Sequence, residues 1–129
     1  MPTDKTIKAA VVGIGHLGRH HARLLAQVPG VELVAMVDPR LDEVRPLADE
    51  LGVPLIADAG DLGDDVQAVS VAAPTSLHHA LVCPLLERGM HVMVEKPIAA
   101  TVDEGRAMAA LAEDRGLVLR VGHIERFNP

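Results

Sequence analysis

The chain has 129 residues, of which 49% are hydrophobic and 23% charged, and its formal net charge is −6. This size and apolar content fit one folded domain with its own core, whereas the negative charge argues against a nucleic-acid partner, which needs a basic face. The single cysteine, Cys83, excludes an internal disulfide and favours a reducing, cytoplasmic setting. Apolar runs are too short for a signal-peptide core or a membrane span, so we expect no membrane association.

Short apolar segments alternate with amphipathic ones along the chain. The first, residues 7–13, is nearly continuously apolar, which is typical of a parallel strand buried on both faces. Residues 16–28 then predict a helix that Pro29 and Gly30 end. Further strands are expected at 31–38, 54–58, 67–74, 91–97 and 117–123, and further helices at 41–51, 76–89 and 101–116. This alternation predicts an α/β fold, a doubly wound parallel sheet of the Rossmann type with about six strands and helices on both faces.

A glycine-rich loop, GIGHLG, joins the first predicted strand to the first helix. Gly13 permits a sharp turn, Gly15 removes a side chain where a diphosphate would approach, and Gly18 lets the helix pack closely on the sheet. The loop therefore predicts dinucleotide binding, and the alternative is a tight turn with spare glycines. The backbone N–H groups expected to bind the phosphates, helped by the helix dipole, belong to Ile14, Gly15, His16 and Leu17.

An acidic residue follows at the distance that a dinucleotide site requires. Asp38 stands 20 residues after Gly18 at the end of the second strand, where a carboxylate can bind both ribose hydroxyls of adenosine. It would repel a 2′-phosphate by about 1 to 4 kcal/mol, so we expect NAD rather than NADP. Arg40 would weaken this preference by pairing with a phosphate. The alternative is that Asp38 only begins a turn before Pro39.

A methyltransferase that binds S-adenosylmethionine is a competing interpretation, because its glycine loop is similar. Such enzymes usually have an acidic residue just before the glycines. Residues 8–12, KAAVV, contain none, so a dinucleotide is favoured.

The end of the fourth strand is expected beside the first, where the winding of the sheet reverses. Ligands bind in the crevice at such a point. Ala73, Pro74 and Thr75 are therefore predicted to border the cofactor, although the Thr75 hydroxyl also suits an ordinary helix cap.

Histidines are frequent in the first helix. His20 and His21 are expected at its surface. His16 and His20 are four residues apart, but no acid or cysteine joins them, so we expect no metal site.

The segment Glu95-Lys96-Pro97, at the end of the fifth strand, is the most discriminating of the sequence motifs. The chain resembles the cofactor domain of the Gfo/Idh/MocA family (glucose–fructose oxidoreductase, inositol dehydrogenase and rhizopine catabolism), with the pattern GxGxxG, D, PxxxH and GxHVxxEKPxA. The resemblance covers essentially the whole chain. The matching residues are Gly13, Gly15, Gly18, Asp38, Pro74, His78, Gly89, His91, Val92, Glu95, Lys96, Pro97 and Ala99.

The resemblance implies an NAD(P)-dependent dehydrogenase acting on sugars, nucleotide sugars or cyclitols. It implies that Glu95 and Lys96 lie near the nicotinamide, that Lys96 contacts or polarises the substrate hydroxyl, and that His78 faces the crevice. A cation at this point also suits hydride transfer chemically, because an alkoxide-like centre becomes a carbonyl. The alternative is a surface Glu–Lys pair.

The tail, residues 121–129, resembles a subset of the family that oxidises UDP-N-acetylglucosamine at the sugar 3-position, which implies that Arg126 and Asn128 lie near the nicotinamide. Family members continue with a second domain that completes the substrate pocket and carries the subunit interface. Residues 1–129 lack that domain, so we expect cofactor binding without turnover, and self-association through the surfaces it would cover. The alternative is a non-catalytic nucleotide-sensing module, which has no use for Lys96.

Overall fold

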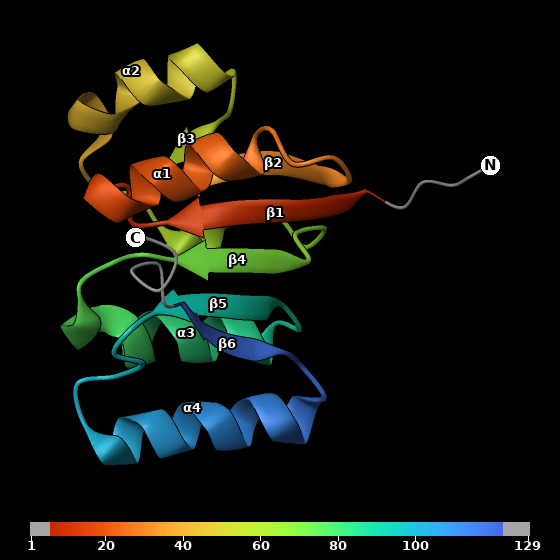
Figure 1. The fold of residues 1–129 in the computed structure, drawn as a ribbon, viewed down its shortest axis with the longest axis vertical. Helices are drawn as coiled ribbons and strands as arrows, with labels where there is room; N and C mark the ends of the chain where they lie inside the picture. Colours follow the sequence, from red (N-terminus) through yellow and green to blue (C-terminus); the bar gives the residue numbers. More distant parts are fainter. Residues whose placement is uncertain (1–5, 123–129) are drawn as a thin grey trace, which may run out of the picture.

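A six-stranded sheet in the order β3-β2-β1-β4-β5-β6 runs through the middle of the structure, and every neighbouring pair is parallel (Figure 1). The computed structural model describes residues 6–122. Because β1 lies between β2 and β4, the winding reverses there, and the predicted Rossmann fold is confirmed. The strands are β1 (Ile7–Val12), β2 (Val31–Val37), β3 (Leu55–Ile56), β4 (Ala68–Val71), β5 (His91–Glu95) and β6 (Leu119–Gly122).

Helices connect successive strands. Among residues 6–122, none is long and apolar enough to cross a membrane. Two differences from the expected elements stand out, since the third strand has only two residues and the helix expected from residue 76 begins with a 3-10 turn. The helices are α1 (His16–Leu25), α2 (Leu41–Leu51), α3 (His78–Glu87) and α4 (Val102–Arg115), with 3-10 turns η1 (Ala59–Asp61) and η2 (Thr75–Leu77).

The helix ends follow local signals. Thr101 precedes α4, and its Oγ1 accepts a hydrogen bond from the Glu104 N–H at 3.1 Å, as an N-cap does. Gly52 and Gly116 follow α2 and α4 with φ of 67°, a left-handed conformation that glycine adopts without steric cost.

The sheet has an apolar layer on each face. Alternate residues of a strand point to opposite faces, so α1 and α2 pack on one side of the sheet and α3 and α4 on the other. The buried residues on the first side are Val11, Ile14, Ala22, Leu33, Met36, Val44, Leu47 and Ala48. Those on the second side include Val12, Val37, Val71, Val82, Leu85, Leu86, Val94 and Met108.

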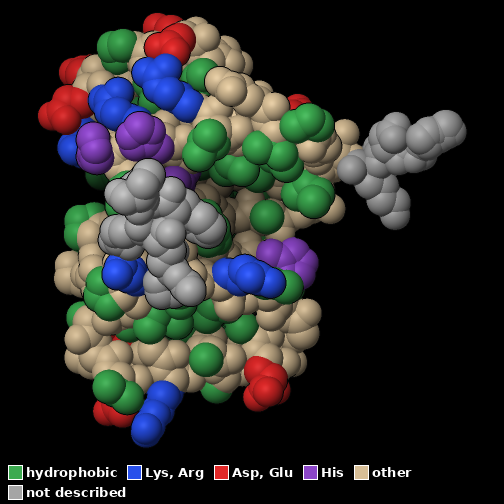
Figure 2. Space-filling model, in the orientation of Figure 1, with side chains coloured by type: hydrophobic (Ala, Val, Ile, Leu, Met, Phe, Trp, Pro, Cys, Tyr) green, Lys and Arg blue, Asp and Glu red, His purple; other side chains and the backbone are tan. Residues whose placement is uncertain are grey.

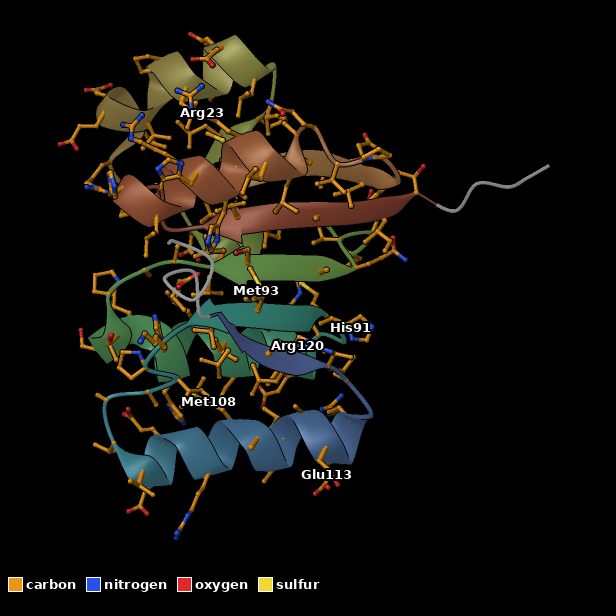
Figure 3. The ribbon with its side chains drawn as sticks, in the orientation of Figure 1. Arg23, His91, Met93, Met108, Glu113 and Arg120 are labelled. Atoms are coloured by element: carbon orange, nitrogen blue, oxygen red, sulfur yellow. The ribbon has the colours of Figure 1, made fainter. Side chains whose placement is uncertain are left out.

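Among residues 6–122, no helix covers the α1 face of the sheet over β5 and β6. Met93 is 38% exposed there and Val118 51%, and Figure 3 shows Met93 and Arg120 on this face of the sheet. They line a hollow of about 230 Å³ together with Leu25 of α1. The described helices therefore bury the two faces of the sheet unequally.

Burial predicts that alanine substitutions at two leucines change the free energy of unfolding by very different amounts. Leu86 on α3 is fully buried, whereas Leu24 on α1 is 60% exposed. Because Leu86→Ala opens a cavity, we expect it to lower the free energy of unfolding by about 2 to 5 kcal/mol. Leu24→Ala removes the same atoms from the surface and should change that free energy by less than about 0.5 kcal/mol. Urea denaturation measures both, and equal losses would contradict this packing.

Candidate cofactor-binding site

A cavity of about 830 Å³ opens at the carboxyl ends of β1, β2 and β4. This is the crevice expected at the reversal point, and its volume lies in the range of small-molecule and cofactor sites. Figure 2 shows histidine and basic side chains gathered over α1, next to this region. The lining residues are Val12, Gly13, Gly15, His16, Leu17, Val37, Asp38, Pro39, Arg40, Ala57, Asp58, Ala59, Ala72, Ala73, Pro74, Leu77 and Leu81.

The three loop glycines have different steric surroundings. Gly13 has φ of +90°, and a Cβ there would lie 2.6 Å from the Ala73 N atom. A Cβ at Gly18 would lie 1.8 Å from the Gly13 carbonyl oxygen, so both positions exclude a side chain because backbone occupies the space. At Gly15 the nearest atom is Arg40 Nη2 at 3.9 Å. Gly15 thus leaves its space to the cavity, which fits a cradle for a diphosphate.

Asp38 is buried at the end of β2, where it is 2% exposed. Its Oδ2 accepts hydrogen bonds from the Ile14 N–H at 2.8 Å and from Arg40 Nη2 at 2.9 Å. Its Oδ1 accepts from the Arg40 N–H at 2.8 Å and from Arg40 Nε at 3.0 Å. The carboxylate therefore ties the glycine loop to β2, with the half-exposed Arg40 side chain lying over it.

These hydrogen bonds determine the charge of Asp38. Burial alone raises the pKa of a carboxyl group, but the side-chain and backbone hydrogen bonds of Arg40, the Ile14 N–H and the Arg40 charge together lower the pKa of Asp38 to about 2. Asp38 is thus ionised at neutral pH and is paired with the Arg40 cation on the same wall of the cavity.

Other predicted cofactor residues are partly in the cavity wall and partly behind it. Gly13, Gly15, His16, Leu17, Asp38, Arg40, Ala73 and Pro74 line the cavity. The predicted residues outside its wall are Ile14, Gly18, Thr75, His78, Glu95 and Lys96. Arg126 and Asn128 lie outside the described residues. The roles of all these residues toward a cofactor stay predictions, including that of Ile14, whose N–H is engaged by Asp38.

His78 lies beneath the cavity and is 1% exposed. Its Nε2 is 2.8 Å from the Ala73 carbonyl oxygen, and its Nδ1 is 3.0 Å from that of Pro97 and 3.1 Å from that of Ile98. The ring therefore ties the end of β4 to the segment that follows β5, where the Lys96–Pro97 peptide is cis.

The expected surface position of His21 is wrong. His21 is 4% exposed, with Nδ1 2.6 Å from Ser70 Oγ and Nε2 3.0 Å from Glu95 Oε2. The physical reason is helical spacing, since His21 lies three residues after Gly18 and so on the same, sheet-facing side of α1. That spacing is a signal in the sequence, but the partners Ser70 and Glu95 come from strands far along the chain.

The exposed histidines of α1 stack edge to face. The ring centroids of His16 and His20 are 5.4 Å apart. Within residues 6–122, no three His, Cys, Asp or Glu side chains gather in a group that would hold a metal ion.

Sequence reasoning missed one wall of the cavity. Ala57, Asp58 and Ala59 follow β3 and face the loop across the cavity. The observed strand order explains the position of this wall, because β3 lies next to β2 and its carboxyl end comes close to Asp38.

Residues 7–123 match the model of the Gfo/Idh/MocA family, the oxidoreductase family with an NAD-binding Rossmann fold. The chain belongs to this family. The fold of this family binds NAD, and solved relatives contain NAD or, in some cases, NADP.

Three relatives illustrate the similarity. UDP-N-acetylglucosamine 3-dehydrogenase of Acidithiobacillus ferrooxidans is 34% identical over 123 residues, which are 95% of this chain and 39% of the relative, and its structure gives a TM-score of 0.88. Scyllo-inositol dehydrogenase of Lactobacillus casei with NAD(H) and scyllo-inositol gives 0.86 at 29% identity, covering 96% and 38%. KijD10, a 3-ketoreductase of Actinomadura kijaniata with TDP-benzene and NADP, gives 0.86 at 28% identity, covering 96% and 40%. The chain spans about two fifths of the length of these relatives.

The lowered pKa of Asp38 predicts acid sensitivity. The carboxylate of the unfolded chain titrates near 3.8 and that of the folded chain at about 2, so its stabilising contribution is complete above the first value and disappears as the pH falls through the second. We expect this loss to be roughly 2 kcal/mol. Asp38→Asn should lack that part of the pH dependence, as measured by denaturant unfolding from about pH 5 downward. An unchanged pH profile in the variant would contradict the hydrogen-bond network.

Proposed function

We propose that this chain is the cofactor-binding domain of a dehydrogenase that transfers hydride between NAD and a hydroxyl group of a sugar, nucleotide sugar or cyclitol. The observation that carries the proposal is the buried, ionised Asp38 next to a glycine loop that opens into a cavity of about 830 Å³. Two of the relatives named above are a UDP-N-acetylglucosamine 3-dehydrogenase and a scyllo-inositol dehydrogenase, which supports this substrate class.

The loop binds the diphosphate. Gly15 leaves room for phosphate oxygens to approach the backbone, because a Cβ there would meet only the tip of the Arg40 side chain at 3.9 Å. The N–H groups at the start of α1 then donate to the phosphate, and the dipole of the helix adds favourable charge. His16 and Leu17, which also line the cavity, flank the phosphates.

Asp38 selects the ribose. Its oxygens accept hydrogen bonds from the half-exposed Arg40 guanidinium, so a ribose diol binds by taking the place of that guanidinium while the Ile14 N–H bond remains. A 2′-phosphate meets the same carboxylate at close range and is repelled. Arg40, half-exposed beside it, offsets part of that repulsion.

Cofactor selectivity is a direct test. Calorimetric titration should give an NAD affinity at least about fivefold above that for NADP, because a charge repulsion of about 1 kcal/mol or more separates them. Asp38→Ala should remove this preference. Asp65→Asn, which changes an exposed carboxylate paired with Lys8 at the other end of β1, is the matched control and should keep it. A wild-type preference for NADP would overturn the role of Asp38.

Lys96 is proposed as the catalytic residue. Bound nicotinamide supplies the hydride-accepting or hydride-donating carbon. Lys96 directly follows β5 at the carboxyl edge of the sheet, where a cation stabilises the alkoxide that develops on the substrate oxygen and exchanges a proton with it. A hydroxyl-bearing, sugar-like substrate, UDP-N-acetylglucosamine in one candidate subset, suits this chemistry.

Substitution of Lys96 tests whether the protein is an enzyme or a non-catalytic nucleotide sensor. In a form of the protein that has dehydrogenase activity, Lys96→Ala should lower kcat by at least about 100-fold, while the Kd for NAD changes by less than about threefold. Lys8→Ala, at the amino-terminal end of β1, should change neither. An unchanged kcat in Lys96→Ala would remove the catalytic role and favour a sensing module.

The cellular setting and the assembly of the protein are further parts of the proposal. The single cysteine, Cys83, supports a cytoplasmic location. The exposed Met93 and Val118 on the open sheet face support self-association of this chain.

A further inference from the structure

A second polar cluster lies on the α1 face of the sheet, outside the cavity wall. It consists of His21 from α1, Ser70 from β4 and Glu95 from β5, which are 4%, 5% and 7% exposed. His21 is central, with its Nδ1 2.6 Å from Ser70 Oγ and its Nε2 3.0 Å from Glu95 Oε2. Burying three polar side chains in an apolar layer is costly unless they are hydrogen-bonded. Ser70 Oγ is within hydrogen-bond distance of His21 Nδ1, whereas His21 Nε2 and Glu95 Oε2 make a close polar contact but no hydrogen bond among the described residues.

The cluster continues the contact between the glycine loop and the sheet. Gly18 and His21 lie one helical turn apart on the same side of α1, and Ser70 lies in β4 two residues before Ala72, which directly follows that strand. Gly18 packs against Gly13 and Ala72, so the helix that begins at the dinucleotide loop is held at β4 by Gly18 and at β4 and β5 by His21. One turn of helix therefore separates the glycine loop from the residue that contacts Glu95.

Gly122 makes room for the Glu95 carboxylate. It pairs with Glu95 in the register of β5 and β6, and a Cβ at Gly122 would lie 2.8 Å from Glu95 Oε2. Any larger residue would displace the carboxylate oxygen that contacts His21. The absence of a side chain at Gly122 thus allows the Glu95 carboxylate to lie where it contacts His21.

Burial determines the protonation state of His21. Desolvation lowers the pKa of the His21 imidazole, against the opposing effect of Glu95, so the ring is neutral near pH 7. A neutral ring whose Nδ1 accepts the Ser70 hydroxyl proton carries its own proton on Nε2, which lies 3.0 Å from Glu95 Oε2 in a polar contact without hydrogen-bond geometry. The same residue types form hydrolytic triads, but Ser70 is buried in the middle of β4, paired with Val11 on one side and Met93 on the other, where a substrate carbonyl has no access.

We propose that His21 is a positioning residue for Lys96: it holds the Glu95 carboxylate and thereby links the adjoining Lys96 to the helix that begins at the dinucleotide loop. The inference rests on the proposed NAD site. In this proposal, cofactor binding at the start of α1 changes the position of Lys96, directly after β5, through the contact between His21 and Glu95.

Nuclear magnetic resonance of this chain, with lysine labelled by carbon-13 at Cε, tests the link. NAD should shift the Lys96 signal of the wild-type chain and leave the Lys8 signal, at the opposite end of the sheet, unchanged. Gly122→Ala displaces the carboxylate without altering His21 or Glu95, and it should remove at least about half of the Lys96 shift while the Kd for NAD stays within about threefold. His21→Leu should do the same.

Two further variants make the comparison specific. Gly63→Ala is the matched glycine control, because its added Cβ would lie 2.8 Å from the exposed Asp65 Oδ1, and it should leave the Lys96 shift intact. His21→Gln keeps an N–H near the Nε2 position and should restore part of the shift that His21→Leu loses. If His21→Leu does not fold, Gly122→Ala decides alone.

The outcomes separate the two proposals. A wild-type chain that fails to bind NAD refutes the proposed function, and this inference with it. A chain that binds NAD but shows no Lys96 shift, or shows the full shift in Gly122→Ala, overturns the positioning role of His21 and leaves the NAD site standing.

Discussion

The site depends on the close approach of the glycine loop to the end of β4. Gly13 lies so near Ala73, and Gly18 so near Gly13, that a side chain at either position would overlap backbone atoms. This contact sets the direction in which α1 leaves the sheet. It therefore also sets where the free N–H groups of the helix point and which residues of α1 meet the sheet. The cavity and the buried cluster at His21 are two consequences of one packing constraint.

Asp38 holds the same loop in place and also presents its carboxylate toward the cavity. Its Oδ2 accepts the Ile14 N–H, a contact that holds the loop to β2, while both oxygens are covered by Arg40 from the solvent side. The inner contact can persist when a ligand binds, and the outer one can be exchanged for hydroxyl groups. One carboxylate can thus preorganise the loop and remain available to a diol, which a residue used only for packing could not do.

The elements and their order could be predicted because they depend on local pattern. Continuous apolar runs, helix caps and glycine spacing involve residues close together in the sequence, and they predicted the parallel sheet and the glycine loop. The short β3 and the burial of His21 could not be predicted in the same way. The length of β3 depends on how far its neighbour β2 remains in register, which covers only two pairs. The partners of His21 come from β4 and β5, which only the folded sheet brings beneath α1.

Two buried histidines hold the chain on either side of Lys96. His21 contacts Glu95, the residue before it, from the α1 face, and His78 contacts the carbonyl oxygens of Pro97 and Ile98, the residues after it, from α3. Each histidine also reaches β4 or its end, through Ser70 or Ala73. Ala73 lines the cavity, so the backbone on either side of Lys96 is tied at one point to β4 and at another to the cavity wall that follows β4. A long, flexible lysine side chain gains directional precision from such a base, because only its own rotamers remain to be restrained when a substrate arrives.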